Sequence, residues 1–294
     1  MKVIRAKVMG FCMGVRRAEE LACAESRQAG GARVFTLGPL VHNPKVLADL
    51  KECGVETLDE LPSACDLKSC SVIIRAHGIS ATIEKDLREK GFRIVDATCP
   101  KVKASQLKAQ ELSRAGYCLF LAGEAHHAEI EGVMSYAQAG STPFCVVVSD
   151  AVEAEKEAAK LLKADKNAKT ALLGQTTICE DEYSQIGEAV KKYFPNLEIV
   201  QTICSATTER QKALRELLKQ VEVDAALIIG GRESANTRHL LSIAKESGKP
   251  CTLVENAGEI PPVFFTYGTV GLSAGASTPD SVIDEIETAL LRGA

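Results

Sequence analysis

Several features that would point to a membrane or to nucleic acid are missing from the sequence. No run of about eighteen or more uncharged apolar residues occurs, which argues against a membrane-spanning helix. The opening MKVIRAKVMG predicts a strand and not the apolar core of a signal peptide. Acidic and basic residues are interspersed, and a net charge of -4 leaves no basic stripe for nucleic acid. We therefore expect a soluble, cytoplasmic protein without membrane or nucleic-acid partners.

Two short motifs are also missing, a C-x-x-C pair and a G-x-G-x-x-G run, so no nicotinamide or flavin fingerprint is present. Eleven cysteines remain, an odd number without the spacing of a small secreted protein, which indicates reduced thiols or thiolate ligands. Cys65 and Cys70 form the one close pair. Cysteines in apolar runs are expected to fill the core as small hydrophobic residues: Cys23, Cys53, Cys118, Cys145 and Cys251.

The sequence is rich in alternating strand-like and helix-like segments. Runs such as SVIIRA, YCLFLAG and AALIIGG alternate with amphipathic segments such as SATIEKDLREK and DEYSQIGEAVKKY. This alternation predicts an α/β fold with parallel strands and helices on both faces of the sheet. No long Pro-, Gly- or Ser-rich linker interrupts the pattern.

Three segments of the chain resemble one another: VMGFCMGVRRAEELA, VDATCPKVKASQLKA and VQTICSATTERQKAL. In each, a strand leads to a cysteine, a turn-prone residue follows, and a polar helix begins. The repeated cysteines are Cys12, Cys99 and Cys204. The repeat therefore predicts three similar α/β lobes, each contributing one cysteine.

The pattern around the cysteines assigns the lobes to 13–98, to 99–200, and to 201–294 together with 1–12. The third unit is split, because its loop and helix close the chain while its strand opens it. Each lobe also has two polar loops at the carboxyl ends of its strands, the edge where open α/β sheets bind ligands. If the lobes face one another, the cysteines and loops converge on one central cavity.

Three thiolates in one cavity have few uses. Structural zinc takes four ligands, catalytic zinc takes three with nitrogen or oxygen usually among them, and a disulfide takes two. A four-iron cluster held by three cysteines leaves one iron open to a substrate. From the repeat alone, an iron-sulfur cluster and three buried structural cysteines both remain open.

The polar loops carry neutral hydrogen-bonding groups that suit a phosphate. Histidines occupy equivalent loops of the repeat at His42, His77 and His127. The remaining loops offer hydroxyl and amide groups near expected helix N-termini: Thr176, Thr177, Ser234, Asn236 and Ser277. Simple N-capping is the alternative for each of these residues taken singly.

Glu129 follows His127 closely and is a candidate proton donor, provided that burial raises the pKa of its carboxyl group. The alternative is an exposed acidic residue in the first turn of a helix, as we expect for Glu131. The apolar periodicity around Glu129 does not require it to face inward.

Ordered motifs along nearly the whole chain resemble one known family: GFCMGV, VHNP, AHGIS, DATCPKV, HHAEIEG, GQTT, ICSATTERQ and AGASTPD. The sequence is similar to the 4-hydroxy-3-methylbut-2-enyl diphosphate reductases, the LytB/IspH family. The resemblance implies three lobes in a trefoil around a [4Fe-4S] cluster. It also implies reductive dehydroxylation of an allylic diphosphate to isopentenyl and dimethylallyl diphosphate, the last step of the methylerythritol phosphate pathway. An external ferredoxin or flavodoxin is the implied electron donor.

The resemblance also implies roles for single residues. Cys12, Cys99 and Cys204 would hold the cluster. Glu129, which would supply a proton, and Thr176 would lie near the reacting hydroxyl, with His127 beside them as a further catalytic candidate. The implied diphosphate-binding positions, to which we add Thr176 and Ala235, are His42, His77, His127, Ser234, Asn236 and Ser277.

Two positions depart from the family pattern. Ala235 stands where a second serine is common, which removes one side-chain donor to the diphosphate. Ala128 stands where a proline usually follows the loop histidine, in the loop that carries Glu129. Two other functions remain open: a sensor that binds a diphosphate without reducing it, and a zinc-dependent hydrolase that uses the same cysteines.

Overall fold

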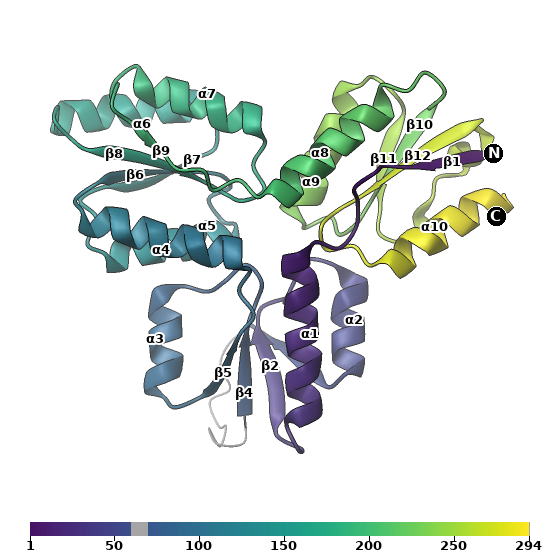
Figure 1. Cartoon of the computed structure of the whole chain (residues 1–294), viewed down its shortest axis with the longest axis horizontal. Helices are drawn as coiled ribbons and strands as arrows, with labels where there is room; N and C mark the ends of the chain where they lie inside the picture. Colours follow the sequence, from purple (N-terminus) through teal and green to yellow (C-terminus); the bar gives the residue numbers. More distant parts are fainter. Residues whose placement is uncertain (60–69, 294) are drawn as a thin grey trace.

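The computed structural model describes residues 1–59 and 70–293. Its strands form three parallel sheets of four strands each, and each sheet with its helices makes one lobe (Figure 1). The lobes surround a common centre, so the predicted α/β trefoil is confirmed. We keep 13–98, 99–200 and 201–294 with 1–12 as the proposed lobe boundaries.

Lobe 1 contains a sheet with the strand order β3-β2-β4-β5. Its strands are β2 (Arg33–Leu37), β3 (Val55–Leu58), β4 (Cys70–Ile74) and β5 (Arg93–Asp96), and its helices are α1 (Met13–Gln28), α2 (Pro44–Glu52) and α3 (Ala81–Glu89). In Figure 1 this lobe lies at the bottom of the molecule.

Lobe 2 contains a sheet with the order β7-β6-β8-β9. Its strands are β6 (Cys118–Ala122), β7 (Cys145–Val148), β8 (Thr170–Gly174) and β9 (Glu198–Ile199), and its helices are α4 (Pro100–Arg114), α5 (Ala128–Ala139), α6 (Ala151–Ala164) and α7 (Glu180–Lys191). The pair α4 and α5 covers one face of the sheet, and α6 and α7 cover the other (Figure 1).

Lobe 3 contains a sheet with the order β1-β12-β10-β11, so the first strand of the chain pairs with the last. Its strands are β1 (Lys2–Arg5), β10 (Ala225–Ile229), β11 (Cys251–Val254) and β12 (Thr269–Ala274), and its helices are α8 (Ser205–Leu218), α9 (Ala235–Glu246) and α10 (Asp280–Arg292), with short 3-10 helices η2 (Ala257–Glu259) and η3 (Pro262–Thr266). Both termini lie in this lobe (Figure 1).

Alternation along the central strands explains the layers of each lobe. In β6, Leu119 and Leu121 pack against α4 and α5, whereas Phe120 packs against α6 and α7. All five residues of β6 are buried, as its uninterrupted apolar run predicts. Burying one such large side chain contributes about 1.5–3 kcal/mol. In lobe 2, apolar contacts therefore hold one pair of helices against each face of the sheet.

Two expectations need correction. Cys53 is exposed and not in the core, because it lies at the carboxyl end of α2, whereas Cys118 is buried as expected. The strand expected before Cys204 is reduced to the two residues of β9, since the chain turns after Val200, where Thr202 N–H donates to the Val200 carbonyl at 2.9 Å. Cys65 lies outside the described residues. No helix in the described part of the chain is long and apolar enough to cross a membrane.

Candidate functional site

A central cavity lies where the three lobes meet, and every site residue predicted from the sequence lines it. These residues are Cys12, His42, His77, Cys99, His127, Glu129, Thr176, Cys204, Ser234, Ala235, Asn236 and Ser277. They come from all three sheets, at the carboxyl ends of strands and at the N-termini of helices. The N-terminus of a helix carries a partial positive charge, so helices that begin at the cavity make it favourable for anions.

The three cysteines occupy equivalent places in the fold. Cys12, Cys99 and Cys204 are the N-cap residues of α1, α4 and α8. The N–H of Val15 donates to the Cys12 sulfur at 3.4 Å. Burial raises the pKa of the Cys99 thiol, and the neighbouring Cys12 and Cys204 raise it further, although backbone N–H groups act in the opposite direction. Three thiolates here therefore require a bound cation to balance them.

The donor set fits an iron-sulfur cluster better than a single metal ion. Three residues in the described part of the chain, His42, His77 and His127, have potential donor atoms that all lie within 4.8 Å of one another. The three cysteine sulfurs do not lie this close together. A wider spacing suits a multinuclear cluster, and soft thiolates are the ligands that iron-sulfur clusters use. Gly14 leaves the space open, because a Cβ atom there would lie 2.7 Å from the Cys99 sulfur.

Glu129 points inward, and its side chain is only 1% exposed. Its two carboxyl oxygens accept hydrogen bonds from the N–H of Thr176 at 2.7 Å and from the Thr176 hydroxyl at 2.8 Å. Burial raises the pKa of Glu129 to about 7, although both bonds from Thr176 act to lower it. The carbonyl of Thr176 in turn accepts the N–H of Cys204 at 3.0 Å. Thr176 thus links Glu129, a carboxyl group with a pKa near 7, to Cys204, one of the three candidate thiol ligands.

The three histidines form a compact cluster with ring centroids 4.7 to 6.2 Å apart. Desolvation lowers the pKa of all three rings, to about 4 for His127. The Nδ1 atom of His127 accepts the N–H of Glu129 at 3.2 Å, so the neutral ring carries its proton on Nε2. This tautomer presents a donor rather than a lone pair, which suits an anion better than a metal ion.

Several polar groups in the cavity have no partner among the described residues. Both amide atoms of Asn236 and the Nδ1 atom of His77 are buried without a hydrogen bond. Buried polar groups of this kind usually mark a site where a ligand or water binds. Ser234 also acts as a cap, because its hydroxyl accepts the N–H of Thr237 at 3.4 Å. Ala235 is 2% exposed and contributes only a methyl group to the lining.

Sequence reasoning missed two cations at the site. Lys101 lines the cavity next to Cys99, at the start of α4. Arg210 is 4% exposed, and its guanidinium donates to the Gly10 carbonyl at 2.5 Å and to the Ala206 carbonyl at 2.7 Å. It therefore joins the segments that carry Cys12 and Cys204. The sequence signal for Arg210 was its position about two turns into a helix that begins at a candidate ligand cysteine.

The fold and the cavity together define a class, that of α/β proteins with three lobes around a central cavity to which each lobe contributes one thiol. The profile of the family described as LytB protein matches residues 3–291. The 4-hydroxy-3-methylbut-2-enyl diphosphate reductase of Treponema denticola is 42% identical over 100% of both chains. That of Aquifex aeolicus is 37% identical over 97% of this chain and 94% of its own.

Solved structures of such reductases have the same fold. One, described as the terminal enzyme of the non-mevalonate pathway, is 35% identical with a TM-score of 0.71 over 99% of this chain and 100% of its own. The reductase of Plasmodium falciparum is 25% identical with a TM-score of 0.88 over 98% of this chain and 87% of its own. The chain belongs to the LytB family of 4-hydroxy-3-methylbut-2-enyl diphosphate reductases, as its motifs predicted.

Proposed function

We propose that this protein is an oxidoreductase that converts 4-hydroxy-3-methylbut-2-enyl diphosphate to isopentenyl and dimethylallyl diphosphate in the cytoplasm. The allylic C–O bond breaks, two electrons and two protons enter, and the hydroxyl leaves as water. The observation that carries the proposal is the convergence of three thiols, a carboxyl group that titrates near pH 7 and unpartnered donors in one cavity. Family membership over the full length supports it.

In this proposal the loop residues bind and orient the diphosphate. His127 offers its Nε2–H, and Asn236 offers amide groups that lack a partner within residues 1–59 and 70–293. The hydroxyl groups of Ser234 and Ser277 lie in the same cavity at the N-termini of α9 and α10. Helix N-termini favour anions even without arginine. Fixing the diphosphate end directs the allylic hydroxyl toward the thiols, and such positioning can supply several kcal/mol of the barrier reduction.

Glu129 and Thr176 would hold and move the proton. In its neutral form Glu129 can donate its proton to the Thr176 oxygen, which lies 2.8 Å away. The Thr176 hydroxyl is then free to turn its own hydrogen toward the cavity. A proton can thus reach the leaving hydroxyl although the carboxyl group is almost fully buried.

Cys12, Cys99 and Cys204 would hold a [4Fe-4S] cluster, which supplies electrons and a Lewis-acidic iron when bound. The two electrons would come from a reduced ferredoxin or flavodoxin, since the sequence has no dinucleotide-binding motif of its own. Lys101 and Arg210 place positive charge next to the thiolates and would favour the loaded state.

The first experiment is anaerobic purification with measurement of visible absorption, iron, sulfide and zinc. We expect a brown protein with close to four irons and four sulfides. The Cys204→Ser variant should lose most of the colour, whereas Cys53→Ser, an exposed cysteine far from the cavity, should keep it. Consumption of the allylic diphosphate with a reduced viologen dye then tests turnover.

Other results would contradict the proposal. A colourless protein with stoichiometric zinc, active without a reductant, would support a hydrolase. A protein that binds the diphosphate tightly but reduces none of it, with its cluster intact, would support a sensor. Retention of colour in Cys204→Ser would remove Cys204 from the proposed ligand set.

A further inference from the structure

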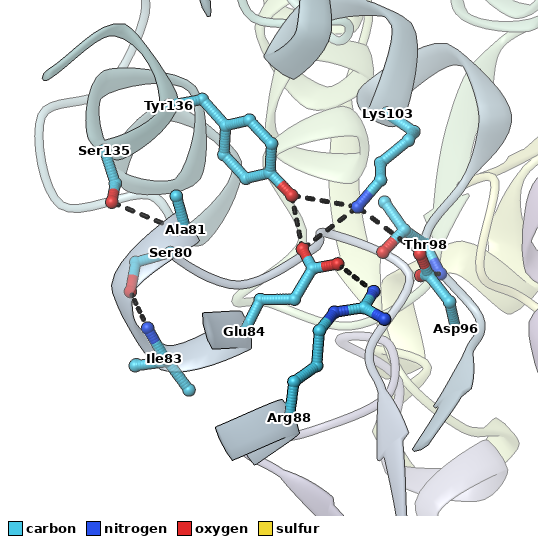
Figure 2. Close-up of polar contacts among 10 residues, drawn as sticks. All are labelled: Ser80, Ala81, Ile83, Glu84, Arg88, Asp96, Thr98, Lys103, Ser135 and Tyr136. Carbon is cyan, nitrogen blue, oxygen red and sulfur yellow. Dashed lines mark hydrogen bonds and ion pairs between the residues drawn. The ribbon is translucent and has the colours of Figure 1, made fainter. Parts of the chain in front are cut away.

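A buried carboxylate lies between lobes 1 and 2, away from the cavity. Glu84 on α3 is 9% exposed and is surrounded by three donors (Figure 2). Lys103 of α4 donates to its Oε2 atom at 3.1 Å, the Tyr136 hydroxyl of α5 donates to the same atom, and Arg88 donates to Oε1 at 2.6 Å. One carboxylate of lobe 1 thus joins two helices of lobe 2.

The donors around Glu84 also contact one another. Lys103 donates to the Tyr136 hydroxyl at 2.9 Å and pairs with Asp96 of β5 at 3.4 Å (Figure 2). Burial would raise the pKa of Glu84, but the hydrogen bonds from Tyr136, Arg88 and Lys103 lower it to about 2. The carboxylate is therefore charged and fully paired at any working pH. A closed network of this kind holds its members in one geometry.

Two further contacts dock α5 on the loop that follows His77. The Ser135 hydroxyl accepts the N–H of Ala81 at 3.1 Å, so α5 caps the start of α3 (Figure 2). A Cβ atom at Gly132 would lie 3.5 Å from the carbonyl of Ile79, which shows how closely the loop approaches the helix. The network and these contacts lie along one side of α5.

The same helices begin at the candidate active-site residues. His127 caps α5 and Glu129 lies in its first turn, while Tyr136 lies about two turns further along the same helix. Cys99 caps α4, and Lys103 lies one turn further along. On the lobe 1 side, His77 precedes the cap of α3, which carries Glu84. Lys103, Tyr136 and Glu84 therefore each lie on a helix that begins at or shortly after a candidate site residue.

We propose that Glu84, Tyr136 and Lys103 form a positioning lock that sets His77 of lobe 1 against His127 and Glu129 of lobe 2. The inference rests on the proposed function, because it assigns His77 to the diphosphate. Tyr136 and Glu84 are positioning residues and do not touch the substrate. Removing the Tyr136 hydroxyl leaves Glu84 paired with Lys103 and Arg88, so the fold should survive while the docking of the two lobes loosens.

The test measures binding of inorganic diphosphate to the anaerobic holoprotein by calorimetry. Tyr136→Phe is expected to weaken binding about tenfold and to raise KM more than it lowers kcat, with the visible spectrum of the cluster unchanged. The matched control is Tyr193→Phe, whose hydroxyl donates at 3.4 Å to Glu155, a carboxylate that also pairs with a lysine but lies within lobe 2. This control should bind diphosphate like the wild type.

A role through His77 requires that the effect depend on His77. In a His77→Asn background, adding Tyr136→Phe should change diphosphate binding less than twofold. Glu84→Gln provides a second variant, and it should show the same dependence. An equal loss with and without His77, or equal behaviour of Tyr136→Phe and Tyr193→Phe, would overturn the lock. A wild-type protein that neither binds diphosphate nor reduces the substrate would overturn the proposed function itself, and the lock with it.

Discussion

At the scale of single residues, the surroundings of Glu129 distinguish it from Glu131. Both are glutamates in the first turn of α5, and their sequence context is similar. Glu131 is exposed, whereas Glu129 is buried against Thr176, a residue 47 positions further along the chain. Sequence periodicity could not decide which one faces inward, because the contact that decides it comes from another loop. Its place two residues after His127 and the family motif were the signals that pointed to Glu129.

We predict that the Glu129→Gln variant loses turnover but still holds the cluster and binds the substrate. Glutamine has nearly the same shape but no acidic proton, so kcat should fall by about 100-fold or more. Binding of inorganic diphosphate and the visible spectrum should stay close to those of the wild type. Glu131→Gln is the control and should retain activity. A Glu129→Gln enzyme with normal kcat would exclude Glu129 as the proton donor.

At the scale of elements, the sequence predicted the repeated order of strand, loop and helix, because strand patterns and turn residues are local. It also placed the cysteines at helix starts, which the structure bears out at Cys12, Cys99 and Cys204. The sequence could not predict the contact of Glu84 with Tyr136, because this contact joins helices of two different lobes. Nor could the sequence show that Gly14 lies against the sulfur of a distant cysteine.

We predict that Gly14→Ala impairs cluster loading although alanine favours helices. Gly14 lies in the first turn of α1, where alanine should add about 1 kcal/mol of helix stability. The new methyl group would lie 2.7 Å from the Cys99 sulfur, which is too close, so this thiol must shift, whereas the 3.9 Å to the Cys12 sulfur is an ordinary contact. Iron and sulfide per chain after anaerobic reconstitution should fall by at least half.

Gly187→Ala is the matched control for this prediction, because Gly187 also lies inside a helix. There the nearest atom is the end of the flexible Ile199 side chain at 3.2 Å. Its iron content should equal that of the wild type. Full loading of Gly14→Ala would mean that the thiols can move without loss of the cluster.

At the scale of the whole molecule, the central site depends on three lobes that each have their own core. Their shared cavity concentrates desolvated titratable groups, and the stability of the protein must therefore depend on pH. Glu129 and His127 act in opposite directions. The pKa of Glu129 is raised to about 7 from its ordinary value of 4.5, while that of His127 is lowered to about 4 from 6.5.

The sign for each group follows from proton binding in the folded and unfolded states. Between about pH 4.5 and 7, folded Glu129 holds a proton that the unfolded chain has lost, so its contribution to stability declines as pH rises. Between about pH 4 and 6.5, unfolded His127 holds a proton that the folded protein lacks, so its contribution increases as pH rises. The two effects largely cancel in the wild type.

Glu129→Gln should therefore reveal the histidine effect. From pH 4.5 to pH 7, the unfolding free energy of the variant should increase by about 3 kcal/mol relative to that of the wild type. The reason is that the wild type loses the contribution of Glu129 over this range, whereas the variant has no such contribution to lose. The lost hydrogen bonds to Thr176 add an offset that does not depend on pH, so only the slope of the difference is informative. Anaerobic thermal unfolding of both holoproteins across this range measures it, with Glu131→Gln as the control. A difference that stays flat with pH would show that Glu129 ionises normally in the fold, and would remove the basis for its role as an acid at neutral pH.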